Sequence, residues 1–422
     1  MTYQDALDFL YPLHRFGIKP GLDVVRALLD HLGSPERGLG LVIHIAGTNG
    51  KGTVAAALAS IFQASGKKTA LYTSPHLVDF SERMRINGEP IPGERVACYC
   101  SQLKQRAAGT PYTFFEATTA IAFAWFADEK VDVSIIETGM GGRLDATNIL
   151  DPAYAVITSI GLDHTDWLGE TRALIAEEKA AIIKKGCRVY TAVSDPEAFQ
   201  PISWVAGLHE VSLFVAGQDA VWSVLCAEAG ALQLDLRTAS GYYPALKAPL
   251  SGSFHASNVA LAVMVAEDAG VAPEYIYAGL EQLVRTGYRA RLEKIGVYPA
   301  VLLDVSHNSD GMRQTVNAIA DFRSEYRAVH VILGLASDKD AVSVIRELAR
   351  LDCDFYPVNI PSERSVPAEQ LARLCFDAGN EATVFKTGSE ALGYLREYSK
   401  PDDLILVTGS FYLAGEIIAS GY

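Results

Sequence analysis

The sequence predicts an α/β protein of two domains, each built around a mostly parallel sheet. Short runs that are almost continuously apolar alternate with longer segments rich in Ala and Leu, as strands buried on both faces alternate with the helices that cover them. The chain has 422 residues, enough for two or three domains of ordinary size. Its 49% hydrophobic and 20% charged residues are typical of a globular protein and exclude a disordered or fibrous chain.

The first α/β series fills the amino-terminal part of the chain. Strands are expected over residues 41–46, 69–72, 131–137 and 154–160, and helices over residues 51–65, 93–107, 115–128 and 170–185. Because strands and helices alternate, right-handed crossovers would make neighbouring strands parallel. Residues 186–250 are punctuated by Gly and Pro and rich in Val, Trp and Tyr, which predicts a small antiparallel sheet, followed by a helix over residues 255–270.

A second α/β series begins near residue 299. Its strands are expected over residues 300–305, 329–333, 355–358, 382–385 and 404–408. We therefore place a domain boundary at residues 286–289, which divides the chain into residues 1–287 and 288–422. Ligands of such folds bind outside the carboxyl ends of the strands and often between domains, so a cleft between the two domains is expected.

Composition excludes several classes of partner. Lys and Arg number 36 against 50 Asp and Glu, a net charge of −14, which argues against a nucleic-acid binder and requires positive charge to be concentrated locally if the ligands are anions. The apolar stretch 117–127 is about half the length that a membrane-spanning helix needs. Asp5 and Asp8 lie where a signal peptide would be basic or apolar, and the six cysteines are dispersed. We expect a cytoplasmic protein with neither a nucleic-acid nor a membrane partner.

The strongest local motif is HIAGTNGKGT at residues 44–53, between a predicted strand and a predicted helix. Small residues let backbone N–H groups approach a phosphate, and the helix N-terminus and Lys51 add positive charge. The motif departs from the common phosphate loop because residue 45 is Ile and the hydroxyl of Thr53 comes one position late. The alternative is a polar turn, but the pattern favours a nucleotide site formed by Thr48, Asn49, Gly50, Lys51, Gly52 and Thr53.

Polar residues also follow three other predicted strands. Ser74 lies in TSPHL, Glu137 ends VDVSIIE, and His164 lies in IGLDH. A carboxylate at the end of an apolar strand is costly unless it is paired or bound to a cation, and its hard oxygens suit Mg²⁺. Because the carboxyl ends of parallel strands meet at one edge of a sheet, Ser74, Glu137 and His164 would converge there. Taken singly, each has a structural alternative: a turn, a salt-bridged strand end and a hydrogen-bonded loop histidine.

Two further segments have ordinary structural interpretations by themselves. Lys179, in AEEKAAI, lies in a pattern typical of a solvated helix face. Residues 113–116 (TFFE) precede an apolar helix, where an aromatic pair usually belongs to the core.

The ordered motifs nevertheless resemble one known family. The string GTNGKGT resembles the loop of the Mur ligase superfamily of ATP-dependent amide ligases, and the glycine after the lysine is similar to its folate branch, dihydrofolate synthase/folylpolyglutamate synthase. The strings SPHLVDFSERMRING and ETGMGGRLDATN resemble further motifs of that branch, and the resemblance runs from about residue 3 to 422. It implies a P-loop-type ATP-binding domain with a small antiparallel sheet, and a second, Rossmann-like α/β domain.

The resemblance also implies roles for residues of the first domain. Mg²⁺ ions would be held by Thr53, Ser74, Glu137 and His164, with a carbamylated Lys179 binding a second ion. Residues that would contact the pterin-bearing substrate are Thr113, Phe114, Phe115, Glu116, Leu144, Asp145 and Ala146, with residues 16–20 as a further wall.

Later motifs of the family match less closely. By resemblance, Asn258 would contact adenine, Arg291 the phosphates and Asp304 the ribose, while His307 and Ser410 would lie on the glutamate side. The loop at residues 303–311 departs from the family pattern at positions 305, 306 and 309.

The implied activity is an ATP- and Mg²⁺-dependent ligase that joins L-glutamate to dihydropteroate, to reduced folates or to both, through an acyl phosphate. Lys51, Glu137, His164, Lys179 and His307 would carry catalysis, a hinge is expected near Thr286, and a monomer suits the architecture. Two alternatives remain open: another Mur-type ligase, such as one acting on peptidoglycan precursors, and an ATP-binding protein without ligase activity, which the altered loop at 303–311 suggests.

Overall fold

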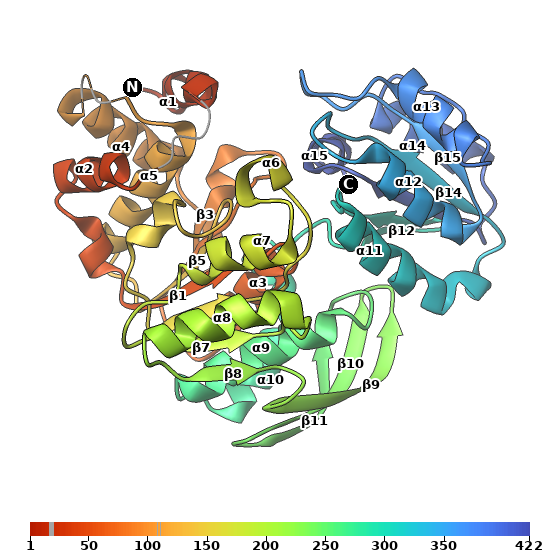
Figure 1. The fold of residues 1–422 in the computed structure, drawn as a ribbon. Coiled ribbons are helices and arrows are strands. Elements are labelled where there is room, and N and C mark those ends of the chain that lie inside the picture. Colours follow the sequence, from red (N-terminus) through yellow and green to blue (C-terminus); the bar gives the residue numbers. More distant parts are fainter. Residues whose placement is uncertain (17–20, 108, 110) are drawn as a thin grey trace. The chain divides into compact units, whose positions relative to one another are not determined.

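The computed structural model describes residues 1–16, 21–107, 109 and 111–422 (Figure 1). Of the substrate wall expected at residues 16–20, residues 17–20 therefore lie outside the described residues. The chain forms two compact units: Met1–Trp222 with Leu236–Tyr243 and Ser257–Gly287, and Ser223–Asp235 with Pro244–Ala256 and Tyr288–Tyr422. Each has its own sheet and hydrophobic core.

The first unit is built on an eight-stranded sheet with the order β4-β3-β2-β5-β1-β6-β7-β8. Its strands are β1 (Leu41–Ala46), β2 (Thr69–Tyr72), β3 (Met84–Ile86), β4 (Glu89–Pro90), β5 (Val133–Glu137), β6 (Tyr154–Ile157), β7 (Arg188–Thr191) and β8 (Leu213–Val215). All neighbours are parallel except at the edge, where β3 pairs antiparallel with β2 and β4. The predicted α/β class with a mostly parallel sheet is confirmed.

Helices cover this sheet. They are α1 (Tyr3–Leu10), α2 (Asp23–His31), α3 (Lys51–Ala64), α4 (Gly93–Arg106), α5 (Phe114–Asp128), α6 (Thr165–Leu168), α7 (Arg172–Ala180), α8 (Pro196–Leu208), α9 (His255–Asp268) and α10 (Pro273–Glu281). One core joins Val42 of β1 to α1, α2, α4 and α5, and another joins Ala46 to α7 and α8. Val42 and Ala46 are four residues apart on one strand, so both cores lie on the same face. Helix α3 packs on β1, β2 and β5, and α10 packs on α3.

Residues 186–215 differ from the prediction. They continue the parallel sheet as β7, α8 and β8 instead of starting an antiparallel one. The prolines that suggested turns belong to a helix, because Pro196 lies in the first turn of α8 and Pro201 lies within it. The small sheet is confined to β9 (Ala220–Glu228), β10 (Ala231–Thr238) and β11 (Tyr242–Ala248), in the order β11-β10-β9. The short turns between these strands are those of antiparallel neighbours.

The second unit holds a five-stranded sheet with the order β12-β13-β16-β14-β15. Its strands are β12 (Glu293–Val297), β13 (Ala300–Leu303), β14 (Val329–Leu333), β15 (Cys353–Pro357) and β16 (Leu404–Thr408), and its helices are α11 (Ser309–Phe322), α12 (Ala341–Leu348), α13 (Ala368–Asp377), α14 (Gly388–Tyr398) and α15 (Phe411–Ala419). Only β12 runs antiparallel to its neighbour. The strand expected at 382–385 is wrong: Ala382 makes a single bridge to Phe355.

Within the part of the chain that the structure describes, no helix is long and apolar enough to cross a membrane.

Candidate active site

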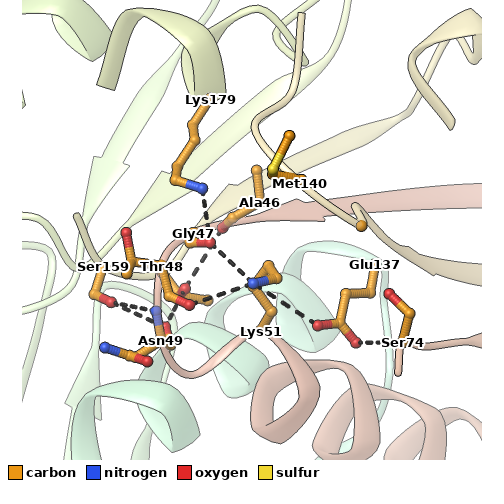
Figure 2. A network of polar contacts seen from close by, with 12 residues as sticks. Ala46, Gly47, Thr48, Asn49, Lys51, Ser74, Glu137, Met140, Ser159 and Lys179 are labelled. Atoms are coloured by element: carbon orange, nitrogen blue, oxygen red, sulfur yellow. Dashed lines mark hydrogen bonds and ion pairs between the residues drawn. The ribbon is translucent and has the colours of Figure 1, made fainter. Parts of the chain in front are cut away.

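The polar segments of the first unit meet at the carboxyl edge of its sheet. Strands β2, β5, β1 and β6 are adjacent and parallel, so the segments that follow them leave the sheet on the same side. Ser74 follows β2, Glu137 ends β5, the loop 47–50 follows β1 and Ser159 follows β6. Figure 2 shows these residues as one network of hydrogen bonds and ion pairs, with Lys179 of α7 joining it.

The loop at residues 47–50 is held by the segment that follows β6. The Thr48 N–H donates to the Ser159 carbonyl at 2.7 Å, and the Asn49 N–H donates to the Ser159 hydroxyl at 3.1 Å. The Thr158 hydroxyl donates to the Asn49 carbonyl at 2.6 Å. The loop is therefore clamped to the neighbouring strand on both sides of Asn49.

Gly50 is the residue before α3, and its backbone has a positive φ of 87°. It offers no capping side chain to the first turn of α3. A Cβ at Gly50 would lie 2.6 Å from Oδ1 of Asn258, which α9 places beside the loop. Only glycine fits here, and the helix N-terminus it precedes meets the requirements of a phosphate site.

Lys51 lies at the centre of the network (Figure 2). Its Nζ donates to the Gly47 carbonyl at 3.0 Å and to the Thr48 carbonyl at 3.3 Å, and lies 3.9 Å from the Glu137 carboxylate. The Glu137 carboxylate also accepts a long 3.4 Å hydrogen bond from the Ser74 N–H. This carboxylate is almost buried, and its hard oxygens are of the kind that Mg²⁺ prefers.

Lys179 is buried in the first unit, although its sequence pattern by itself suggested a solvated helix face. Its Nζ donates to the Gly47 carbonyl at 3.0 Å, the same carbonyl that Lys51 contacts. Burial, with a smaller contribution from the charge of Lys51, lowers the pKa of Lys179 to about 7. A lysine with that pKa is substantially neutral in mildly alkaline solution and is then nucleophilic.

Two further predicted metal ligands, Thr53 and His164, also belong to the first unit. Thr53 is buried in the first turn of α3. His164 precedes α6 with a left-handed backbone (φ 53°), its side chain is 39% exposed, and its Nε2 lies 4.0 Å from Asp163. Among the described residues, no three His, Cys, Asp or Glu side chains form a metal cluster, so a cation here would need hydroxyl ligands as well.

The predicted substrate run forms the start of α5. Thr113 and Glu116 make a capping box: the Thr113 hydroxyl accepts from the Glu116 N–H, and the Glu116 carboxylate accepts from the Thr113 N–H at 2.7 Å. Phe114 is buried and stacks on Tyr11 at 6.0 Å between ring centroids. Phe115 lies so close to Gly139, in the loop after Glu137, that a Cβ there would be 2.5 Å from the ring. The run therefore reaches the carboxyl edge through Phe115.

Asp145 shapes the loop that follows β5. Its buried carboxylate accepts hydrogen bonds from the N–H groups of Gly139 at 2.8 Å and Met140 at 3.0 Å and from the Thr147 hydroxyl. Burial raises the pKa of Asp145, and these hydrogen bonds oppose the shift. The neighbouring Ala146 is buried, whereas Leu144 is 46% exposed and is the member of this trio that faces solvent.

Sequence reasoning missed His44, on β1. Its Nε2 lies 2.8 Å from the Thr147 hydroxyl, and burial lowers the pKa of His44 to about 3. Because Thr147 donates its single hydrogen to Asp145, the neutral imidazole must carry its proton on Nε2. A histidine in the apolar run LVIHIA was the available signal, since a buried polar group needs a partner.

In the second unit, Asp304 is buried at the end of β13. Its Oδ1 accepts from the Leu292 N–H at 3.1 Å, and its Oδ2 accepts from the Ser306 N–H at 3.0 Å and the Thr315 hydroxyl at 2.9 Å. The carboxylate thus ties together the segment after Arg291 and the loop that carries His307.

His307 and Ser410 also lie in the second unit. The Nδ1–H of His307 donates to the Val305 carbonyl at 2.8 Å, and Ser410 caps α15 by accepting from the Tyr412 N–H at 3.0 Å. Arg291 and His307 both lie against the ring of Phe411, a residue that sequence reasoning did not single out.

Comparison with known proteins identifies the family. Residues 45–266 match the Mur ligase middle domain, and residues 290–411 match the Mur ligase, glutamate ligase domain. A dihydrofolate synthase/folylpolyglutamate synthase of Bacillus subtilis (strain 168) is 34% identical over 436 residues, covering 99% of this chain and 98% of the relative. The chain belongs to the dihydrofolate synthase/folylpolyglutamate synthase family.

Solved structures of this family are similar over the whole chain. Escherichia coli FolC in complex with DHPP and ADP has a TM-score of 0.91 at 30% identity, covering 100% of this chain and 97% of that one. A bifunctional folylpolyglutamate synthase/dihydrofolate synthase with Mn, AMPPNP and L-glutamate bound has a TM-score of 0.86 at 29% identity, covering 100% and 98%. The resemblance to the dihydrofolate synthase/folylpolyglutamate synthase family is confirmed, which counts against a peptidoglycan-type ligase.

Proposed function

We propose that this protein is an ATP-dependent ligase that joins L-glutamate to the carboxylate of dihydropteroate, of reduced folates or of both. The observation that carries the proposal is the network in which Lys51 links the phosphate loop to Glu137 at the carboxyl edge of the sheet. Family membership supports it, because relatives are named for both reactions and solved relatives hold DHPP with ADP, or Mn with AMPPNP and L-glutamate.

ATP binds at the loop 47–53. The N–H groups at the start of α3 and the Lys51 ammonium bind its phosphates. Asn258, which lies beside Gly50, contacts the adenine. In the second unit, Arg291 contacts the phosphates of ATP, and Asp304 belongs to the ribose subsite. Because both Asp304 oxygens already accept protein hydrogen bonds, its contribution to the ribose subsite is mainly to shape the backbone around it.

Mg²⁺ fits the donor set. Glu137, Ser74, Thr53 and His164 would hold one ion, and Lys179, once carbamylated, a second; when bound, the ions offset phosphate charge. The near-neutral pKa of Lys179 supports carbamylation, because only a neutral amine attacks CO₂.

Two chemical steps follow. An oxygen of the acceptor carboxylate attacks the γ-phosphorus of ATP, the bond to the β-phosphate oxygen breaks, and an acyl phosphate and ADP form. The neutral amine of glutamate then attacks the acyl carbon and loses a proton, the bond between that carbon and the phosphate oxygen breaks, and inorganic phosphate leaves as the amide forms. Lys51 and Arg291 offset the negative charge that develops on the transferred phosphoryl group. His307 and Ser410 contact the incoming glutamate.

The acceptor would lie against Phe115 and the exposed Leu144, with Phe114, Thr113, Glu116, Asp145 and Ala146 supporting that surface. We further propose that the boundary between the two catalytic domains lies at 287/288, and that the protein acts as a monomer in the cytoplasm on small molecules alone.

The test is phosphate release from Mg·ATP and L-glutamate with dihydropteroate or tetrahydrofolate as acceptor. Glutamate-dependent release is expected and should be lost in Lys51→Ala and Glu137→Ala. The exposed Lys185→Ala and Glu210→Gln serve as controls. The ratio of rates with the two acceptors separates the synthase from the polyglutamylating activity. Tight ATP binding without release from either acceptor would refute the proposed function.

A further inference from the structure

Phe411 brings together two side chains to which the proposed function gives different tasks. The Cζ atom of Arg291 lies 4.8 Å from the centroid of the Phe411 ring, within the range of a cation–π contact. The His307 ring lies 5.8 Å away, centroid to centroid, tilted by 56°. Arg291 serves the phosphates of ATP and His307 serves the glutamate, so one ring supports both sides of the reaction.

The backbone that carries the Phe411 ring is held in place by the start of α15. Phe411 is the first residue of α15 and follows the capping residue Ser410. The Ser410 hydroxyl accepts from the Tyr412 N–H at 3.0 Å, and the Ser410 carbonyl accepts from the Ala414 N–H at 3.1 Å. A capped helix start restricts the backbone of its first residues, so the ring is presented from a rigid element.

The backbone around Arg291 is fixed as well. Ala290 and Leu292 are buried and have left-handed φ angles of 58° and 50°, which non-glycine residues adopt only when their surroundings enforce it. The Leu292 N–H is held by Asp304. The Arg291 side chain is held at two points: its Nη1 donates to the Ala290 carbonyl at 3.2 Å, and its guanidinium lies over the Phe411 ring.

His307 is constrained similarly. Its Nδ1–H donates to the Val305 carbonyl, which leaves the lone pair of the neutral imidazole on Nε2. This hydrogen bond restrains the rotation of the imidazole, and the Phe411 ring lies against it.

We infer that Phe411 is a positioning residue that holds Arg291 and His307 as a pair, so that its ring influences the use of ATP and of glutamate together. The inference rests on the proposed function, which assigns the tasks of Arg291 and His307. A ring that only filled space would affect the stability of the second unit and not these two substrates.

The test compares Phe411→Leu, which removes the π face, with Phe411→Tyr, which keeps it. In the phosphate-release assay, Phe411→Leu should raise KM for ATP by about 2- to 30-fold, the range of a cation–π contact, and KM for glutamate by about 2- to 10-fold, the range of an aromatic pair. Phe411→Tyr should keep the KM for ATP and the KM for glutamate within about twofold of the wild-type values. Phe376→Leu, the same change at a 77% exposed position of the same unit, is the matched control and should leave both unchanged.

A double-mutant cycle separates positioning from packing. In an Arg291→Gln background, Phe411→Leu should no longer change KM for ATP but should still change KM for glutamate; in a His307→Ala background the reverse is expected. Unchanged KM values in Phe411→Leu, or equal effects in both backgrounds, would overturn the inference.

Failure of the proposed function is recognised separately, because it appears in the wild type as the absence of glutamate-dependent release. In that event the Kd of Mg·AMPPNP, measured by calorimetry, replaces the assay. A weaker Kd in Phe411→Leu that disappears in the Arg291→Gln background supports the positioning role, and an unchanged Kd overturns it.

Discussion

Lys179 is a long cationic side chain in the interior of the first unit, where an ammonium ion is costly. Its Nζ and that of Lys51 approach the same Gly47 carbonyl, both at 3.0 Å. Burial disfavours the ammonium form of Lys179, and repulsion from the nearby Lys51 ammonium adds to that effect and lowers the pKa of Lys179. The site therefore favours a neutral or modified Lys179.

Carbamylation of Lys179 is expected to depend on pH. Because its pKa is about 7, the amine is mostly neutral at pH 8 and mostly protonated at pH 6, so a carbamate should form at pH 8 and be lost as the pH falls through 7. With ¹³C-bicarbonate, a carbamate carbon signal should appear in wild type and in the exposed Lys185→Ala control and be missing from Lys179→Ala. Activity of Lys179→Ala should fall by about 10- to 100-fold. A signal that persists in Lys179→Ala would contradict the assignment.

Thr147 links two buried groups, the imidazole of His44 and the carboxylate of Asp145, through its hydroxyl. Replacing it by Val, which has the same shape, would remove the hydroxyl that accepts from His44 and donates to Asp145. We expect Thr147→Val to lower the free energy of unfolding by about 1–3 kcal/mol, since the buried His44 imidazole loses its hydroxyl partner while Asp145 keeps its backbone N–H donors. Thr147→Ser, which keeps the hydroxyl, should lose about 1 kcal/mol. Urea unfolding measures both; equal losses would mean that the methyl group, and not the hydrogen bonds, matters.

At the scale of elements, the sequence predicted best where strands are apolar and end in a polar motif. The strands β1, β2, β14 and β16 have the expected bounds, because each is a short buried run with turn residues on both sides. Prediction failed where the sequence pattern was weak or fitted two structures. The four residues of β7 show no clear hydrophobic period. The prolines of α8 are compatible with a turn as well as with a helix start. The edge strands β3, β4 and β12 depend on pairing with a neighbour and have little pattern of their own.

The same division applies to the candidate site. Lys51 and Glu137 could be predicted to lie together because parallel strands share a carboxyl edge. The buried position of Lys179 was accessible only through the family resemblance, since its helix pattern by itself suggested solvent. The ring of Phe411 beside Arg291 joins residues 120 positions apart, a contact that no local pattern encodes.

The start of α3 gives a matched pair of glycine substitutions. Gly50 and Gly66 flank the same helix with similar positive φ angles of 87° and 81°, but a Cβ at Gly50 would meet Asn258, whereas at Gly66 it would meet nothing within 4 Å. We expect Gly50→Ala to weaken binding of Mg·AMPPNP by more than about 10-fold, because Asn258 and the loop must move. Gly66→Ala should cost only about 1–2 kcal/mol of stability, the penalty of the left-handed backbone, without affecting Kd. Equal Kd values for the two variants would contradict this account.

For the whole molecule, the net charge of −14 and the anionic ligands of the proposed reaction are reconciled by local concentration. In the first unit, Lys51 and Lys179 converge on the phosphate loop. In the second unit, the Arg291 guanidinium lies over the Phe411 ring. The overall field repels anions, but each unit presents a local positive charge at short range, where it is little screened.

The stability of the protein in acid should depend on two buried histidines, His44 on β1 and His255 at the start of α9. Burial lowers the pKa of His44 and of His255 to about 3, against about 6.5 in the unfolded chain. Between these values the unfolded chain binds more protons, so the free energy of unfolding should fall as the pH drops from about 6.5 towards 3, by up to about 1.4 kcal/mol per pH unit for each histidine. Urea unfolding at pH 7.5 and 5.0 should show this loss.

His44→Gln should reduce that dependence on pH, and the exposed His31→Gln should leave it unchanged. An identical difference between the two pH values in wild type and His44→Gln would mean that His44 does not titrate on unfolding.

The hydrogen bonds that clamp residues 48 and 49 to the segment after β6 have a consequence for the thermodynamics of nucleotide binding. Because the Thr48 and Asn49 amides already donate to Ser159, the loop has lost its conformational freedom before any ligand arrives. Binding should therefore carry a small ordering penalty, and the amide hydrogens of Thr48 and Asn49 should exchange slowly with solvent even in the nucleotide-free protein. The loop would already have its phosphate-binding conformation, and bound nucleotide would add little to the protection of these two amides against hydrogen exchange.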